Sequence, residues 1–406
     1  MAQELQLKIS HHDAESSHKR AEQVSVLILL HGDSSLLLPL AENVRKDLER
    51  TSHLRVKIMY AEEPSCTEDL ARQFREGYPF VLYLSMQESD AEASGRLYNT
   101  LDVAMLQGKK WAKRDSLALW AHYIADGVWK EVIGTESSFL SSIVYVTKDY
   151  KRAGSVRSSL VVTEWDGSAL RTIFSKNGHI LAPAWLPSEV AKDLAIVFSE
   201  FTLVNVRLMK VLAVGSSPAE IVLNRGGTTV GVSALSANDI IYCHSGALWH
   251  YTYDPDSHQG KHSSVVREKE PCACPVALRN GDIVYCCQGA VKRWSAHDAS
   301  KVVIAKKGFC TAPTVHEGRN ILIFSRRVQG AFQLICKDLE TNVESQITHG
   351  PGNKIDASIS PCGFWAVYTC ERGKKSTICI IDLIHNKSFE VSDVSHYAMC
   401  PAWSSH

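Results

Sequence analysis

From residue 139 onward the chain repeats short apolar runs that are rich in β-branched and aromatic residues and end at a small residue. These runs are residues 195–199, 239–243, 282–286, 320–325 and 365–369. An anchor segment resembling Pro-Ala-Trp precedes each of these five runs, at Pro183, Ser233, Pro275, Pro313 and Ser358, and a sixth anchor, Pro401, lies near residue 406. A repeat of roughly 40 residues built from short strands is typical of a β-propeller, with one four-stranded sheet in each repeat.

The ends of this repetitive region predict how the ring closes. Before Pro183, three strand runs occur without an anchor, at residues 142–146, 159–163 and 169–174. The last anchor, Pro401, has no further strands after it. Three strands and one strand make a complete sheet, and closing the ring removes the exposed sheet edges. We therefore expect an all-β six-bladed β-propeller over residues 139–406, closed by the C-terminal strand.

Residues 23–138 show a different pattern, in which strand runs alternate with helical periodicity. Strands are expected at 24–30, 54–58, 79–84 and, as a single strand, 95–105, and helices at 36–48, 68–75 and 114–133. This pattern predicts a separate α/β domain. The link to the propeller, residues 134–138, is short and favours a fixed docking of the two domains.

The first 22 residues predict a strand followed by a tether. Leu5, Leu7 and Ile9 alternate with polar residues, so residues 4–10 have one apolar face. Residues 11–22 are polar. A tethered strand suits pairing with the sheet edge of another protein, whereas the same pattern also fits the first strand of this chain's own sheet. Both interpretations remain open at this point.

Composition narrows the class of protein. The 406 residues are 45% hydrophobic and 22% charged, which fits a globular chain of two domains. The formal net charge of +0 argues against a nucleic-acid partner bound through phosphate neutralisation. No stretch reaches the roughly 18 to 20 apolar residues that membrane insertion requires. We expect a monomer that binds neither nucleic acid nor the membrane interior.

Motifs for catalysis, cofactors and metals give weak signals. A Gly-x-Ser-x-Gly elbow, a Gly-x-Gly-x-x-Gly loop and a P-loop do not occur in the sequence. Residues 31–35, His-Gly-Asp-Ser-Ser, could hold an anion, although Ser34 or Ser35 more simply caps the following helix. His258 and His262 flank a polar loop. We predict that the protein is not an enzyme and holds no cofactor and no metal.

The twelve cysteines are concentrated after Tyr242, with Cys66 alone before it. In an oxidising compartment such a group could form disulfides. In the repeat, however, Cys243 and Cys286 stand where other blades have Ser199 and Ser325. We therefore interpret them as small buried residues that fill the blades.

At several points the chain resembles the TolB family of the Tol-Pal system in Gram-negative cell envelopes. The similar parts are the helix at 120–135, the strand run Ser141-Ser-Ile-Val-Tyr-Val146, the Pro-Ala-Trp repeats and the terminal Pro401-Ala402-Trp403-Ser404. The Ser-Pro-Asp-Gly that usually follows the anchor survives in traces such as Ser360-Pro361-Cys362-Gly363, which indicates a diverged member. The resemblance implies a periplasmic, non-enzymatic interaction protein that serves outer-membrane integrity and cell division.

Export should leave a signal peptide, and residues 1–4 have neither its charged region nor its apolar core. The chain is then a mature form, or it is cytosolic and the resemblance misleads; we favour the mature periplasmic form.

The resemblance also implies two partner sites. Glu4, Leu5, Leu7 and Ile9 occupy the segment that binds a TolA-like inner-membrane protein. The channel mouth of the propeller would receive a Pal-like peptidoglycan-associated lipoprotein. Counting back from each anchor places these residues at the mouth: His179, Thr229, Pro271, Phe309, Lys354 and Tyr397. The alternative is a propeller-containing hydrolase or a propeller that binds a small ligand at the same mouth.

Overall fold

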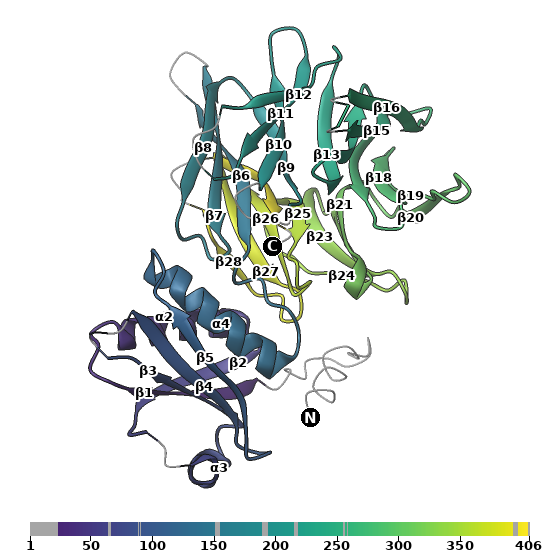
Figure 1. Cartoon of the computed structure of the whole chain (residues 1–406). Helices are drawn as coiled ribbons and strands as arrows, with labels where there is room; N and C mark the ends of the chain where they lie inside the picture. Colours follow the sequence, from purple (N-terminus) through teal and green to yellow (C-terminus); the bar gives the residue numbers. More distant parts are fainter. Residues whose placement is uncertain are drawn as a thin grey trace. The chain divides into compact units, whose positions relative to one another are not determined.

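The computed structural model describes residues 23–404 apart from 64–65, 88, 90, 151–154, 189–193, 215–217, 255, 258 and 393–396 (Figure 1). The predicted N-terminal strand and tether, residues 1–22, lie outside the described residues. The chain divides into two compact units, residues 1–140 and 141–406.

The first unit is built on one mixed five-stranded sheet in the order β2-β1-β3-β4-β5. Its strands are β1 (Val24–His31), β2 (Leu54–Tyr60), β3 (Phe80–Ser85), β4 (Glu92–Asn99) and β5 (Ala104–Ala112), and its helices are α2 (Leu37–Arg50), α3 (Thr67–Phe74) and α4 (Leu117–Ile133). β1 runs parallel to β2 and β3, whereas β4 and β5 are antiparallel. The α/β prediction is confirmed, but the single strand expected over 95–105 is wrong, because these residues cross the turn between β4 and β5.

Packing of the first unit follows the apolar pattern of its strands and helices. The centre of β1, residues 26–30, is at most 1% exposed. A buried hydrogen bond joins two of the helices, since His122 Nδ1 of α4 lies 2.7 Å from Asp47 Oδ2 of α2. In the part of the chain that the structure describes, none of the helices combines the length and apolar character needed to cross a lipid bilayer.

The second unit is a six-bladed β-propeller made of four-stranded antiparallel sheets (Figure 1). From the inner to the outer strand the blades are: blade one, β9 (Ile180–Leu186), β10 (Ala195–Phe201), β11 (Val206–Leu212) and β12 (Glu220–Leu223); blade two, β13 (Thr229–Ser236), β14 (Asp239–His244), β15 (Ala247–Asp254) and β16 (Gln259–Val266); blade three, β17 (Cys272–Ala277), β18 (Ile283–Cys287), β19 (Ala290–Trp294) and β20 (Lys301–Ala305); blade four, β21 (Cys310–His316), β22 (Ile321–Val328), β23 (Ala331–Asp338) and β24 (Glu344–Gln346); blade five, β25 (Asn353–Ile359), β26 (Trp365–Arg372), β27 (Lys375–Asp382) and β28 (Ser388–Glu390); blade six, β29 (Tyr397–Trp403), β6 (Ser142–Tyr150), β7 (Val156–Glu164) and β8 (Arg171–Asn177). Each inner strand contacts the next, and β29 contacts β9, so the ring is closed.

Blade six joins the two ends of the propeller sequence, as predicted. The inner strand β29 pairs antiparallel with β6, and Ala402 lies opposite Val144. Ser404 reinforces the junction, because its backbone N–H donates to Ser142 O at 2.8 Å and its Oγ accepts from the Ser142 N–H at 2.9 Å. The predicted closure by the C-terminal strand is confirmed.

Every inner strand carries one residue with a left-handed backbone. These six residues, named here the channel ring, are Ala182, Gly231, Cys274, Ala312, Asp356 and Cys400, with φ from 48° to 79°. The pairing of the first and second strand shifts at each of them, which marks a β-bulge. The anchor position is the residue that follows the bulge residue, and in four blades this residue is Pro. In blades two and five this residue is Val232 and Ala357, so the predicted anchors Ser233 and Ser358 are wrong by one position.

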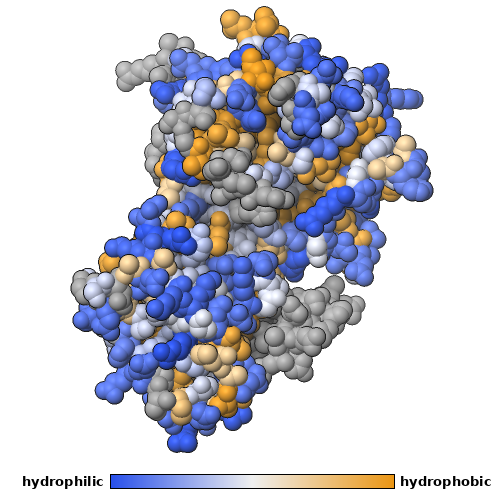
Figure 2. Space-filling view, in the orientation of Figure 1, coloured by the Kyte–Doolittle hydropathy of each residue, from blue (hydrophilic) through white to orange (hydrophobic). Residues whose placement is uncertain are grey.

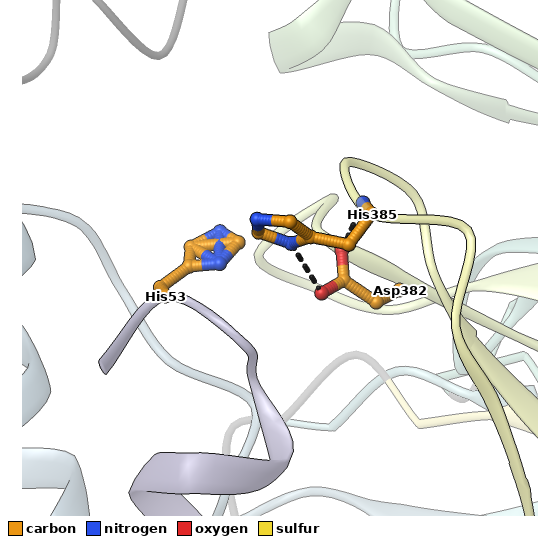
Figure 3. A group of neighbouring side chains, drawn as sticks. All are labelled: His53, Asp382 and His385. Carbon is orange, nitrogen blue, oxygen red and sulfur yellow. Dashed lines mark hydrogen bonds and ion pairs between the residues drawn. The ribbon is translucent and has the colours of Figure 1, made fainter. Parts of the chain in front are cut away.

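Aspartates in the turns between third and fourth strands stabilise those turns, as the pattern indicated. In blade five, Asp382 Oδ1 accepts from the backbone N–H groups of Ile384 and His385, and Oδ2 lies 2.8 Å from His385 Nδ1 (Figure 3). Asp338 accepts from Glu340 and Thr341 in the same way in blade four. These side-chain bonds replace backbone partners that a turn cannot supply.

Candidate functional site: the channel mouth

The six inner strands begin at one end of the ring, and the residues at their starts form the candidate site. Aligned on the bulges, the equivalent positions are His179, Thr228, Pro271, Phe309, Asn353 and Tyr397, named here the mouth rim. His179, Thr228, Pro271 and Phe309 are exposed, and Asn353 and Tyr397 are half-buried. Their side chains are therefore available to a partner at this end of the channel.

Two of the residues predicted for the mouth lie one position further along and face away from it. Thr229 is 0% exposed, and its Oγ1 is 2.9 Å from His244 Nδ1. Lys354 is 3% exposed, and its ammonium donates to the carbonyls of Gly350, Pro351 and Gly352 at 2.6 to 3.2 Å. A shift of one residue along a strand moves a side chain to the opposite face. The misplaced anchors of blades two and five, each wrong by one position, thus account for the buried side chains of Thr229 and Lys354.

Hairpins of the preceding blades hold the rim side chains in place. The Phe309 ring lies over Gly289 in the turn after β18, where an added Cβ would come within 2.7 Å of the ring. The same ring packs edge-on against Phe332, with centroids 6.0 Å apart. Pro271 packs on Gly246 in the equivalent turn of blade two. Both glycines have positive φ, so another residue there would be strained and would displace the rim.

A polar bridge links the rim residues of blades five and six. The Glu371 carboxylate accepts from Tyr397 Oη at 2.8 Å and from Asn353 Nδ2 at 3.1 Å. Burial, together with this carboxylate, raises the pKa of Tyr397 to about 12, so the phenol stays protonated and donates. Tyr150 packs edge-on against Tyr397, with centroids 6.0 Å apart. This part of the mouth presents a fixed surface of aromatic rings and hydrogen-bonding groups.

A compact ion cluster supports the rim at blades six and one. Glu200, which is 7% exposed, accepts from Lys176 Nζ at 2.7 Å and from Arg207 Nε at 2.6 Å. Burial alone would raise the pKa of Glu200, but the two cationic donors outweigh burial and hold it below its ordinary value. Lys176 also donates to the Phe201 carbonyl at 3.0 Å. The cluster fixes the end of β10 beside His179, whose ring meets that of Phe201.

Sequence reasoning missed an apolar tip beside the mouth. Leu203 and Val204, in the turn between β10 and β11, are 105% and 88% exposed. The turn is rigid because Thr202 Oγ1 accepts from the Val204 and Asn205 N–H groups, and Asn205 Nδ2 donates to Asn224. The corresponding turns of blades two, three and four are closed by left-handed pairs such as Ser245-Gly246. Residues 201–225 depart from the repeat, because their third strand run is longer than in the other repeats and the Asp turn is missing; this departure could have identified the tip.

Apolar residues (orange) interrupt the mainly hydrophilic (blue) surface of the propeller in the space-filling view (Figure 2). The exposed apolar side chains at the mouth end include Leu203, Val204 and Phe309. Apolar side chains among polar neighbours are typical of a protein-binding surface.

Inside the channel, the ring contributes one carboxyl and two thiol groups. Cys400 Sγ is 3.6 Å from Asp356 Oδ2. Burial raises the pKa of both groups, so the Cys400 thiol is protonated at neutral pH and is a poor nucleophile. The other ring positions are Ala182, Gly231, Cys274 and Ala312, which offer no acid or base besides the Cys274 thiol.

The remaining sequence candidates are engaged in structural contacts. Ser34 Oγ accepts from the N–H of Leu36, which is the N-cap residue of helix α2. An open pocket of about 650 Å³ beside this turn includes Asp33 and Glu62, whose charges oppose an anion. His262 stacks on Tyr251 and bonds to Tyr242, while His258 lies outside the described residues.

The cysteines are free thiols in the structure. Cys243 and Cys286 are 8% and 6% exposed and belong to apolar clusters of the blades.

Comparisons with known proteins point to one family. No family model matches the chain. The Tol-Pal system protein TolB of Pseudomonas putida is 26% identical over 197 residues, which is 46% of this chain and 44% of the relative. TolB of Xanthomonas oryzae pv. oryzae is 32% identical over 107 residues, 25% of this chain and 24% of the relative. The chain therefore aligns with less than half of the length of these curated relatives.

Among solved structures, the crystal structure of TolB from Acinetobacter baumannii has a TM-score of 0.75 and 18% sequence identity. The match covers 95% of this chain and 97% of that chain. At 18% identity the match shows a similar fold and no more, and this similarity extends over both units. The resemblance to TolB predicted from the sequence is thus confirmed, as a similarity in sequence over part of the chain and a similarity in fold over both units.

Proposed function

We propose that the chain is a non-enzymatic, periplasmic interaction scaffold of the Tol-Pal system. The observation that carries this proposal is that the chain is similar to TolB both in part of its sequence and in its fold. The mouth supports it, because its exposed groups are aromatic, aliphatic and hydrogen-bonding side chains held rigidly by neighbouring hairpins. Such a surface suits a protein partner, which gains affinity from preorganised contacts.

In this proposal the mouth rim and the Leu203–Val204 tip receive a Pal-like peptidoglycan-associated lipoprotein. Four of the residues first proposed for this role, His179, Pro271, Phe309 and Tyr397, belong to the rim. Thr228 and Asn353 replace Thr229 and Lys354, whose side chains are buried. We expect Phe309 to contribute a large share of the binding free energy. An aromatic ring buries a large contact area and loses little side-chain conformational entropy on binding.

The test of the mouth is calorimetry with the soluble domain of such a lipoprotein from the same envelope. Phe309→Asp and Leu203→Asp should each weaken binding at least tenfold, because a charge would be buried against the partner without a counterion. Leu203 is fully exposed, so its variant should keep the melting temperature, whereas the Phe309 variant loses the ring contacts with Gly289 and Phe332 and should melt slightly lower. The matched control is Val343→Asp, which replaces a similarly exposed apolar residue in a turn at the opposite end of the blades.

If both mouth variants bind like the parent chain, the lipoprotein contacts another surface. If the parent chain itself does not bind the lipoprotein, the alternative function, a propeller that binds a small ligand at the mouth, is favoured.

We further propose that Glu4, Leu5, Leu7 and Ile9 pair with a TolA-like inner-membrane protein by β-augmentation. Main-chain bonds would give affinity and the three apolar side chains would give register. Leu7→Asp should abolish binding of that partner, whereas Lys8→Asp, on the polar face, should leave it nearly unchanged. Binding can be measured by pull-down from an envelope extract. Equal binding by both variants would contradict strand pairing with a defined apolar face.

The two partner sites can also be tested for coupling. If the mouth partner controls where the N-terminal strand lies, removing residues 1–10 must change affinity at the mouth by the reciprocal free energy. Calorimetry on the full and shortened chains measures this directly. Identical affinities would mean two independent sites on one scaffold.

A further inference from the structure

The strand register of blade three sets two cysteines directly opposite each other. Cys272 begins β17, Cys287 ends β18, and the two are Cα partners in the antiparallel pair. Cys287 also pairs with Ala290 across a two-residue turn in which Gln288 and Gly289 are both left-handed. In such a turn the flanking residues exchange both backbone hydrogen bonds, so the N–H and C=O of Cys287 point toward β19.

The backbone of Cys272 likewise points away from Cys287, since its N–H donates to Gly246 O at 2.8 Å. The two cysteines therefore form a non-hydrogen-bonded pair. The Cα atoms of such a pair are about 4.5 Å apart, which is within the range that a disulfide spans.

The two sulfur atoms converge on one backbone oxygen. Cys272 Sγ is 4.0 Å and Cys287 Sγ is 3.7 Å from Glu270 O. Both side chains belong to the same apolar cluster and are 1% and 2% exposed. The sulfurs thus lie on the same face of the sheet, which a disulfide requires.

Blade two shows that side chains at this register can contact each other. The equivalent pair in blade two is Thr229 and His244, whose polar atoms are 2.9 Å apart. The pairs at this position in the remaining blades are Ile180 with Glu200, Cys310 with Arg326, Lys354 with Cys370, and Ala398 with Thr147. Of the six pairs, that of blade three alone consists of two thiols.

We propose that Cys272 and Cys287 form a cross-strand disulfide when the chain folds in an oxidising compartment. The oxidant is the disulfide of a thiol–disulfide oxidoreductase or of glutathione. One cysteine thiolate attacks a sulfur of that disulfide and forms a mixed disulfide, and the other cysteine then displaces the oxidant's second thiolate. The chain gives up two electrons and two protons, and the oxidant becomes two thiols.

The structure also sets when this reaction takes place. Burial, with the neighbouring Cys287 and Glu268, raises the pKa of Cys272 to about 12 in the folded blade. The thiol is then protonated and shielded, so it reacts poorly. The bond must form before blade three is fully packed.

The experiment is to refold the purified chain from urea in a glutathione redox buffer and, separately, with a reductant. After oxidative refolding, peptide mapping without reduction should find Cys272 linked to Cys287. Cys272→Ala should abolish the link. Cys286→Ser should retain it, because the adjacent side chain points to the other face and Ser occupies this position in other blades. The oxidised chain should melt roughly 5 °C or more above the reduced one.

Two results would overturn the inference. One is complete alkylation of Cys272 and Cys287 when the oxidatively refolded chain is unfolded with the alkylating reagent present. The other is a link from either cysteine to a third one, such as the neighbouring Cys243. The inference goes beyond the proposed function and needs no partner protein, so failure of lipoprotein binding leaves it intact.

Discussion

At the scale of single residues, Glu200 shows how a buried charge is retained at the mouth. Its two oxygens are taken by two different cations, Lys176 from blade six and Arg207 from the adjacent strand of its own blade. Each cation binds one oxygen, so neither carboxylate oxygen is left without a partner. The residue therefore joins two blades at the point where His179 begins the rim.

We predict that Glu200→Gln lowers the stability of the propeller by on the order of 2 kcal/mol at pH 7, since it leaves two cations facing a neutral amide. The folded pKa of Glu200 lies below its unfolded value, so its contribution is present above the unfolded pKa of about 4.3 and is lost as pH falls through the folded pKa. Urea unfolding of both chains from pH 3 to 8 should show the difference in full above about pH 5.

The control for this prediction is Glu340→Gln, at an exposed turn position with no ion pair in the described residues. It should change stability by less than about 0.5 kcal/mol at any pH. A Glu200→Gln effect that stayed constant down to pH 3 would show that the lost charge is not its cause.

At the scale of elements, the repeated feature is the left-handed residue of each inner strand. An L-residue with a side chain is strained in this conformation by roughly 1 to 2 kcal/mol, and glycine is not. Blade two has a glycine at this position, Gly231, whereas blade one has an alanine, Ala182.

We predict that Ala182→Gly is neutral or stabilises the propeller by up to about 1 kcal/mol, because relief of strain exceeds the extra entropy of the unfolded chain. Gly231→Ala should destabilise it by about 1 kcal/mol. Urea unfolding measures both changes. Ala184→Gly, two residues further along the same strand, is the control and should destabilise by roughly 0.5 to 1 kcal/mol; stabilisation there would contradict the argument.

The bulge also explains which parts of the fold and the site could be predicted. Period-two apolar runs indicate strands reliably, so the blades and their closure followed from the sequence. The extra residue of a β-bulge does not change the hydrophobic pattern of the strand. The sequence therefore predicted Ser233 and Ser358 as anchors in place of Val232 and Ala357. The mouth residues were predicted by counting back from the anchors. The one-position error at Ser233 and Ser358 therefore selected Thr229 and Lys354 in place of Thr228 and Asn353.

The missed hairpin of the first unit has a comparable cause. Apolar residues continue through 95–105, which reads as one strand. The turn is made by side-chain bonds, because Asn99 Oδ1 accepts from the N–H groups of Leu101 and Asp102 at 2.9 and 3.2 Å. Asn and Asp at this spacing favour a turn, and that signal outweighs the apolar pattern. Contacts between distant residues, such as the bridge from Glu371 to Tyr397, leave no pattern in sequence at all.

At the scale of the whole molecule, stability depends on the strand that closes blade six. We predict that deletion of residues 399–406 removes an inner strand and opens the ring, at a cost comparable to the entire stability of a domain, about 5 to 15 kcal/mol. Calorimetric melting of the shortened chain should show loss of the propeller transition, with the transition of the first unit retained. An unchanged melting temperature would refute the closure.

The position of β29 in the chain has a consequence for biosynthesis. The ribosome makes β6 before any of the five complete blades, but the partner of its inner edge, β29, comes after all of them. While the chain grows, the edge of β6 offers unpaired N–H and C=O groups to any extended segment nearby. We expect the nascent protein to depend on a chaperone over this interval, and slow translation of the last blades to promote aggregation of an otherwise stable fold.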